Sequence, residues 1–315
     1  MARHPSGQAA RVYRNPSQEL PEDFELTDEI RAAFDRVEHT RDHVFLTGEA
    51  GTGKTTFLRY FRQNTKKNYI VLAPTGIAAI HIGGQTIHSF FNFPHHLIRA
   101  KDIHALKRHH KLFMALELVI IDEASMMRAD LLDSIDHALR INKANMLAPF
   151  GGVQMLLIGD MHQLPPVISR ELTEHYPRMY DSRYFFSSRA FRSVRFEHFC
   201  LTKIYRQKDR AFIELLNRIR NNEMDREDLE KLNRRVDENC EEYEDCITLT
   251  PTNAQANAIN EARLAKLDSP LLEYEAKISG EFDAPSYPNE VKLQLKVGAQ
   301  VLMIKNDPQK RWVNG

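Results

Sequence analysis

The sequence has few cysteines and no run of apolar residues long enough to cross a membrane. Its three cysteines, Cys200, Cys240 and Cys246, form no C-x-x-C pair and no set with zinc-ligand spacing. A disulfide scaffold and a cysteine zinc module are therefore excluded, and a reducing compartment is expected. The first residues also lack the apolar core of a signal peptide. We expect an intracellular, cytoplasmic protein that does not contact a membrane.

The sequence also lacks an excess of charge of either sign, because Lys plus Arg and Asp plus Glu both number 43. The overall charge therefore indicates no partner, and any surface for nucleic acid must be local. The 315 residues are enough for two domains with sizeable cores. We expect a loosely ordered arm over residues 1–22, a first domain over 23–195 and a second unit over 196–315.

What the sequence does contain is a complete phosphate-binding loop. Residues 48–55 match the pattern G-x-x-x-x-G-K-[ST] without a gap. The glycines permit a tight turn whose backbone N–H groups point at phosphate oxygens, Lys54 supplies a positive charge, and Thr55 can ligate Mg²⁺. We therefore expect the chain to bind ATP with Mg²⁺. The expected nucleotide-binding residues are Gly48, Glu49, Ala50, Gly51, Thr52, Gly53, Lys54, Thr55 and Thr56.

Four continuous apolar stretches separated by helical patterns predict an α/β fold with a central parallel sheet buried on both faces. In such sheets, ligands gather at the carboxyl ends of the strands. Each of the four stretches ends in polar, glycine-rich or acidic residues, so the site is expected there. The expected strands are Val44–Leu46, Tyr69–Ala73, Leu118–Ile121 and Val153–Ile158.

Two further phrases at strand ends suit nucleotide hydrolysis. Asp122 would hold Mg²⁺, and the adjacent Glu123 would take a proton from an attacking water. Gln163, just past another strand, has an amide that can touch the γ-phosphate. The alternatives are an ordinary acidic strand end for the first phrase and a proline-stiffened loop with a surface Gln for the second.

Two segments beyond strand ends suit a nucleic-acid strand, namely Thr75-Gly76 and residues 86–94. Hydroxyls, glycine N–H groups and a His can hold backbone phosphates, and an exposed aromatic ring can stack on a base. The candidate residues are Thr75, Gly76, His88 and Phe90. For Phe90, and for Phe91 and Phe93 beside it, packing in the core is an equally open alternative.

A small basic insertion is expected at about residues 93–112. Between His95 and Lys111 the chain has five histidines and five Lys or Arg residues against a single Asp. Neighbouring histidines cannot readily converge on one metal ion, so contact with phosphates is the better interpretation, and its contribution should fall steeply with salt. A solvated helix face remains the alternative.

The second unit contains two signals. Residues 247–254 repeat the outline of residues 71–78, in which a strand is followed by Pro-Thr and a helix start, and this favours a duplicated nucleotide-binding architecture over coincidence. Arg206 could reach across a cleft to the transferring phosphoryl group. From its position alone, a surface arginine is the alternative.

In this order, the phrases resemble the Pif-type (petite-integration-frequency) DNA helicases, in the 5′-to-3′ branch of superfamily one. The resemblance covers about residues 26–315 and is highly specific. It rests on Gly48–Thr56, Ala73–Ala79, Ile121–Met126, Leu131–Gln154, Gly159–Val167, Tyr205–Gln207 and Pro251–Asn253.

The resemblance implies a RecA-like first domain, followed by the N-terminal part of a second RecA-like domain. It implies that Lys54 and Thr55 bind ATP and Mg²⁺, that Asp122 holds the metal, that Glu123 activates water and that Gln163 senses the γ-phosphate. Arg206 becomes the expected arginine finger. The implied contacts to single-stranded DNA are Thr75, Gly76, His88 and Phe90 in the first domain and Thr252 and Asn253 in the second, with the basic insertion meeting the DNA fork.

Two departures from the family pattern matter. Ile30 stands where the family usually has a Gln that reads adenine, and the family's T-x-H-K-x-x-G and V-A-x-S-R phrases are absent. We therefore expect a truncated, monomeric core of an ATP-dependent 5′-to-3′ DNA helicase, with weak or no ATPase and unwinding in isolation. The alternatives are a nucleotide-gated single-stranded DNA-binding module without turnover and an unrelated phosphate-loop ATPase.

Overall fold

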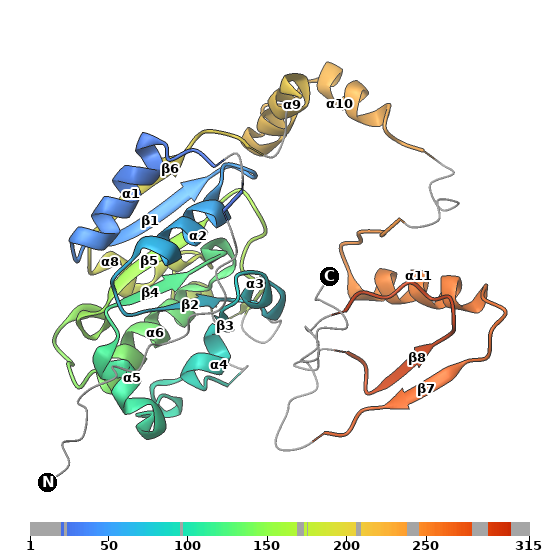
Figure 1. Cartoon of the computed structure of the whole chain (residues 1–315). Coiled ribbons are helices and arrows are strands. Elements are labelled where there is room, and N and C mark those ends of the chain that lie inside the picture. Colours follow the sequence, from blue (N-terminus) through green and yellow to red (C-terminus); the bar gives the residue numbers. More distant parts are fainter. Residues whose placement is uncertain are drawn as a thin grey trace, which may run out of the picture. The chain divides into compact units, whose positions relative to one another are not determined.

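The structure, a computed structural model, describes residues 20–21, 24–94, 97–168, 173–174, 176–205, 209–237, 246–278 and 289–303. The chain divides into two compact units, Met1–Glu223 and Met224–Gly315 (Figure 1), and each is described by itself. No helix in the described part of the chain is long and apolar enough to span a membrane.

The first unit is built on a six-stranded parallel sheet with the order β3-β2-β4-β5-β1-β6. The predicted α/β class is confirmed, and the four predicted strands are present as β1, β2, β4 and β5. The sequence did not predict β3, a two-residue edge strand, or β6. The strands are β1 His43–Gly48, β2 Tyr69–Ala73, β3 Gln85–Thr86, β4 Leu118–Ile121, β5 Gln154–Gly159 and β6 Phe196–Leu201.

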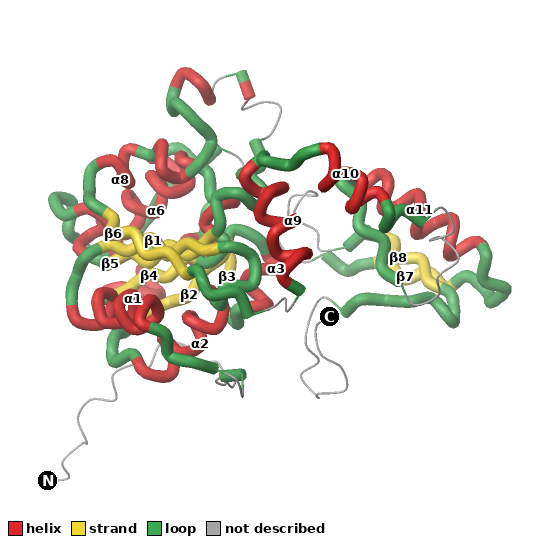
Figure 2. The backbone as a smooth tube through the Cα atoms, turned by 90° about the horizontal axis from the view of Figure 1, so that it is seen from above, coloured by secondary structure: helices red, strands yellow, loops and turns green. Residues whose placement is uncertain are grey.

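Helices cover both faces of this sheet (Figure 2). Side chains of successive strand residues point to opposite faces. On β2, Ile70 and Leu72 join the core beneath α4, α5 and α6, whereas Val71 and Ala73 join the core beneath α1, α2 and α3. The helices of this unit are α1 Asp28–His39, α2 Lys54–Asn64, α3 Gly76–His81, α4 Ile87–Phe91, α5 His110–Ala115, α6 Ala129–Asn142, α8 Arg189–Arg192 and α9 Arg210–Asn221.

The parallel arrangement places the chemistry on one edge. β1, β5 and β4 are neighbours, and their carboxyl ends lead into the phosphate loop, into Asp160 and into Asp122. The next strand, β2, leads into Thr75. The predicted gathering of polar residues at the carboxyl edge of the sheet is therefore present in the fold.

The second unit contains two helices, α10 Arg226–Asn233 and α11 Asn253–Ala265, and an antiparallel pair, β7 Leu272–Glu275 with β8 Lys292–Leu295. The phrase at residues 247–254 reproduces its helix start, because Thr252 caps α11 by accepting from the Gln255 N–H at 3.3 Å. Residues 246–250 form no strand. That this unit is part of a second RecA-like domain stays a prediction.

The units divide later in the chain than the predicted boundary after residue 195. β6 pairs with β1 in parallel along its whole length, from His43 opposite Phe196 to Gly48 opposite Leu201. This pairing makes residues 196–201 part of the first sheet, and the compact units separate after Glu223. Most of the predicted arm, residues 1–19 and 22, lies outside the described residues.

Candidate functional site

The phosphate loop connects β1 to α2 and has the backbone that its glycines predict. Gly53 has φ +91°, and a Cβ on Gly48 would lie 2.4 Å from the Thr52 Oγ1, so neither position accepts another residue without strain. Gly53 is also the N-cap of α2, with no side-chain cap. The first N–H groups of α2 are therefore available to an anion.

Lys54 is folded back onto its own loop. Its Nζ donates to the carbonyl oxygens of Gly48 at 2.7 Å and Glu49 at 2.9 Å. Burial lowers the pKa of Lys54, and the carboxylates of nearby acidic residues oppose that shift. The ammonium therefore sits at the centre of the loop, among carbonyls that phosphate oxygens would outcompete as partners for a cation.

Asp122 is buried at the end of β4, with 8% of its surface exposed. Burial, together with the adjacent Glu123 carboxylate, raises the pKa of Asp122 to about 6. A divalent cation beside Asp122 would relieve both causes. In the described part of the chain no cluster of three His, Cys, Asp or Glu side chains could hold a metal by itself. Mg²⁺ at nucleotide sites is commonly held by one or two carboxylates together with substrate phosphates.

Glu123 has a left-handed backbone, with φ 52° and ψ 41°. A non-glycine residue rarely adopts this conformation, and such residues cluster at functional sites. The conformation starts a short 3₁₀ turn, Ala124–Met126, against which β5 packs closely: a Cβ on Gly159 would lie 3.1 Å from the Ala124 backbone N. The backbone thus fixes the direction in which the Cα–Cβ bond of Glu123 leaves the chain.

Asp160, at the end of β5, holds the segment that carries Gln163. Its carboxylate accepts from the His162 N–H at 3.1 Å and from the Gln163 Nε2 at 3.2 Å. Burial alone would raise the pKa of Asp160, but these bonds and one from Arg220 outweigh it, so the pKa lies below its usual value. The charged carboxylate is therefore a fixed anchor for the predicted γ-phosphate sensor.

The segment after β6 lies against the phosphate loop. The Tyr205 N–H donates to the Gly51 carbonyl at 2.8 Å, and the Tyr205 ring lies 3.3 Å from where a Gly53 Cβ would be. Thr202 donates from its Oγ1 to Glu29 at 2.6 Å. The sequence interpretation gave no role to Tyr205, since packing against a glycine 152 positions earlier has no signal in spacing.

The predicted DNA contacts of the first unit follow β2 and β3 at the same edge. Thr75 accepts from the Ala78 N–H at 3.3 Å, and Gly76 begins α3 with open space beside its Cα. His88 and Phe90 lie on α4, half-buried. Whether these residues contact DNA stays a prediction.

The three phenylalanines of this segment differ. Phe91 and Phe93 are buried in the core, so core packing is the correct interpretation for both. Phe90 is half-buried and lines a cavity of about 440 Å³ together with Lys107, Arg108 and His109 of the basic insertion.

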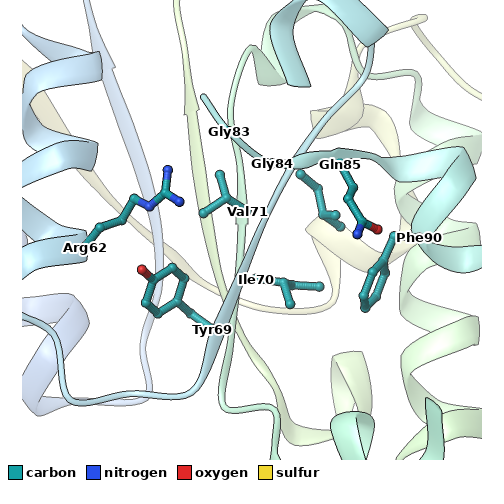
Figure 3. Close-up of a pocket in the computed structure, with 9 residues that line it drawn as sticks. Arg62, Tyr69, Ile70, Val71, Gly83, Gly84, Gln85 and Phe90 are labelled. Atoms are coloured by element: carbon teal, nitrogen blue, oxygen red, sulfur yellow. The ribbon is translucent and has the colours of Figure 1, made fainter. Parts of the chain in front are cut away.

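Phe90 also lines a smaller cavity of about 150 Å³ along β2. In Figure 3, Arg62 and Tyr69 lie at one end of this cavity, and Gln85 and Phe90 lie at the other. Phe90 also packs against the core, with ring-centroid distances of 4.9 Å to Phe91 and 5.4 Å to Phe113. It is therefore partly a core residue and partly a border of open space.

The basic insertion has two sides. Ile98 and Ile103 are buried in the core of the first unit. The cationic side chains are exposed, and they are those of Arg99, Lys101, Lys107, Arg108 and Lys111. His95 and His96 lie outside the described residues.

A family model of the PIF1-like helicases matches residues 25–230. The chain belongs to this family. It is 32% identical over 307 residues to the ATP-dependent DNA helicase Pif1 of Bdellovibrio bacteriovorus, covering 93% of this chain and 66% of that protein. It is 31% identical to human PIF1, covering 91% of this chain and 45% of that protein. The chain thus spans less than two thirds of these relatives.

Solved structures of PIF1-like helicases have the same fold. A structure of two coordinating Pif1 helicases at forked duplex DNA matches with a TM-score of 0.80 and 38% identity, covering 93% of this chain and 70% of that one. The Pif1 helicase from Bacteroides in complex with ADP-AlF3 and single-stranded DNA matches with a TM-score of 0.78 and 37% identity, covering 93% and 69%. These likenesses confirm the predicted family.

Four further positions were singled out in the sequence of this PIF1-like chain. Ile30 stands where the family usually has a Gln that reads adenine. It lies on α1, is buried in the core of the first unit and offers no polar group. Arg206 lies outside the described residues. Thr252 and Asn253 belong to the second unit, where both are exposed at the start of α11.

Proposed function

We propose that this chain belongs to the catalytic part of an ATP-dependent DNA helicase. The observation that carries the proposal is the meeting of three elements at one sheet edge: the phosphate loop after β1, Asp122-Glu123 after β4 and the Asp160–Gln163 segment after β5. Each element is of the type that phosphoryl transfer from ATP to water needs. The names of the relatives, which are ATP-dependent DNA helicases, support the same activity.

The chain's residues would divide the reaction between them. Lys54 would leave the carbonyls of Gly48 and Glu49 and hold the β- and γ-phosphates. Thr55 and Asp122 would hold Mg²⁺, which neutralises charge on the phosphates when bound. Glu123, whose Cα–Cβ direction the left-handed backbone fixes, would accept the proton of the attacking water.

Two further residues would complete the phosphate contacts. Gln163, anchored by Asp160, would contact the γ-phosphate. Arg206 would stabilise the charge on the transferring group. The support for Arg206 is the matching Tyr205-Arg206-Gln207 phrase and the position of Tyr205, which bonds Gly51 of the phosphate loop.

Single-stranded DNA would pass across the first unit over Thr75, Gly76, His88 and Phe90. Phe90 could stack on a base, because its ring borders the 440 Å³ cavity that Lys107 and Arg108 also line. The exposed cations of the basic insertion would contact phosphates near the fork. Thr252 and Asn253 would contact the strand from the second unit. The 5′-to-3′ direction is proposed from the family resemblance.

Hydrolysis with and without single-stranded DNA tests the proposal. Because the chain alone is expected to have weak ATPase activity, release is compared at high protein concentration. We expect DNA to stimulate phosphate release and Glu123→Gln to reduce it by up to about 10²–10⁴-fold, the usual contribution of a general base. The exposed Glu214→Gln on α9 is the matched control and should retain activity. Unwinding of duplexes with a 5′ or a 3′ tail then gives the direction. Phosphate release that persists undiminished in Glu123→Gln would contradict the assignment.

A second candidate is a nucleotide-gated module that binds single-stranded DNA without turnover. It is favoured by the exposure of the second unit, where the only buried residue among those described is Asp228. A unit with so little buried surface offers no rigid scaffold for catalytic residues. Tight DNA binding that depends on ATP, with flat phosphate release, would select this candidate.

A further inference from the structure

Arg220, in the last turn of α9, joins two parts of the nucleotide site. Its Nη1 lies 3.1 Å from the Glu49 Oε1 in the phosphate loop, and its Nη2 lies 3.2 Å from the Asp160 Oδ1 at the end of β5. All three residues belong to the first compact unit. No motif pointed to Arg220, because an arginine near the end of an amphipathic helix is ordinary in sequence.

The bridge differs from a surface ion pair. The Arg220 side chain is only 22% exposed and the Asp160 side chain 2%. Desolvated, hydrogen-bonded charges interact more strongly than exposed ones, which water and salt screen. The same Asp160 carboxylate accepts from the Gln163 amide. Arg220 is therefore linked to the predicted γ-phosphate sensor through Asp160, by two hydrogen bonds.

The guanidinium also has an unused donor. The Arg220 Nε is buried and has no hydrogen-bond partner among the described residues. A buried donor without a partner is unfavourable. The charge of Arg220 also lowers the pKa of Lys54. Two cations, Lys54 and Arg220, thus bond to oxygen atoms of the phosphate loop. A phosphate bound there would compete with these oxygens for both cations.

We propose that Arg220 responds to the terminal phosphate of a bound nucleoside triphosphate. In the structure its guanidinium is shared between Glu49 and Asp160. A triphosphate competes with Glu49 for the guanidinium, since Arg forms its strongest bonds with phosphate and carboxylate oxygens. When Arg220 moves from Glu49 to the phosphate, it no longer restrains the phosphate loop. Its contact with Asp160, which holds the Gln163 amide, changes at the same time. The inference rests on the proposed function, because it requires ATP in this site.

Two substitutions should act in opposite directions if this is correct. Arg220→Gln removes the phosphate contact, so ATP affinity should fall about tenfold, the equivalent of about 1.4 kcal/mol, while ADP affinity stays within about twofold. Glu49→Gln removes the competitor and leaves Arg220 free for phosphate. ATP affinity should then rise severalfold, again with little change for ADP.

Equilibrium titration with fluorescent ATP and ADP analogues measures both affinities of each variant, and from them the ATP-to-ADP ratio. Arg195→Gln is the matched control, since Arg195 forms an exposed pair with Glu197 in the same unit and should leave both affinities unchanged. Arg220→Lys, which keeps the charge without the fork geometry, should recover part of the ATP affinity.

Three outcomes would overturn the inference: equal losses for ATP and ADP in Arg220→Gln, a loss instead of a gain in Glu49→Gln, or no change in either variant. Lys54→Ala separates this failure from failure of the proposed function. Wild-type protein that binds ATP no better than Lys54→Ala would refute the ATP site itself. Normal wild-type binding with an unchanged ATP-to-ADP ratio in both variants would refute only the role of Arg220.

Discussion

In the first unit, Phe57, Phe61 and Phe113 have no exposed surface, whereas in the second unit Leu249 is 91% exposed and Ile247 is 70% exposed. Each unit has a Pro-Thr phrase that leads into a helix. The first phrase follows β2, which lies between β3 and β4 inside the sheet, and the second follows residues that pair with no strand. Similar local sequences thus reach different degrees of packing, because burial comes from neighbouring strands and not from the phrase itself.

The contrast also applies to chemistry. Every predicted catalytic residue that the structure describes lies in the first unit, on backbone fixed by the parallel sheet. In the second unit the described residues form helix caps, one antiparallel strand pair and exposed ion pairs. Pre-organisation of a site needs a packed scaffold, so the first unit alone supplies the fixed part of the proposed reaction.

The largest expected effect tests the packing difference directly. Phe61→Ala should lower the free energy of unfolding by about 3–5 kcal/mol, because it empties a fully buried site. Tyr274→Ala, in the exposed β7 strand, should cost about 1 kcal/mol or less. Denaturant unfolding followed by circular dichroism, with hydrogen exchange to assign the loss to a unit, measures both. Similar costs for the two changes would show that the second unit buries far more than these exposures indicate.

The next effect concerns the pKa values of two carboxyl groups, one from each unit, which shift in opposite directions. Hydrogen bonding by Lys292 lowers the pKa of the exposed Glu273, whereas burial raises that of Asp122 to about 6. A raised carboxyl pKa means that the folded state binds the proton more tightly. The contribution of Asp122 to stability is therefore fully present below its ordinary pKa near 4 and is lost as the pH rises through about 6.

Asp122→Asn should accordingly stabilise the nucleotide-free protein at pH 7.5 by roughly 1–3 kcal/mol, and the difference should vanish near pH 4. Thermal unfolding of both proteins at the two pH values measures it. Magnesium with ATP should reverse the order, because only the wild type offers a carboxylate to the metal. Equal stability of both proteins at pH 7.5 would contradict the burial of an ionised Asp122.

Local patterns in the sequence predicted much of this site. The phosphate loop, Asp122-Glu123 and Gln163 each follow an apolar strand, so period and spacing gave both the parallel sheet and the edge where they meet. Phe91 and Phe93 were ambiguous, since a ring beyond a strand end can either stack on a base or fill a core.

Arg220 and Tyr205 were not predicted, since both act on the phosphate loop through tertiary contacts from more than 150 positions away. β6 was also missed as part of the first sheet. Its alternation of exposed and partly buried residues differs from the continuous apolar pattern of the inner strands, as expected at a sheet edge.

The smallest expected effects come from the threonines of the two Pro-Thr phrases. Substitutions at these positions distinguish a role in helix capping from a role in DNA contact. Thr75 accepts from the Ala78 N–H and Thr252 from the Gln255 N–H, so alanine at either position should cost about 1 kcal/mol of stability. Serine keeps the hydroxyl and should restore most of it. If both hydroxyls also contact phosphates, alanine should weaken binding to single-stranded DNA at low salt severalfold, and serine should recover it.

Fluorescence anisotropy with a labelled oligonucleotide measures this binding. Thr27→Ala is the matched control, since Thr27 caps α1 in the same way and lies outside the segments predicted to contact DNA. Loss of affinity at Thr75 but not at Thr252 would confine the DNA path to the packed unit. Loss at both would mean that the second unit contributes to binding although few of its described residues are buried. A hydroxyl and a helix start would then be enough to hold a backbone phosphate without a rigid scaffold.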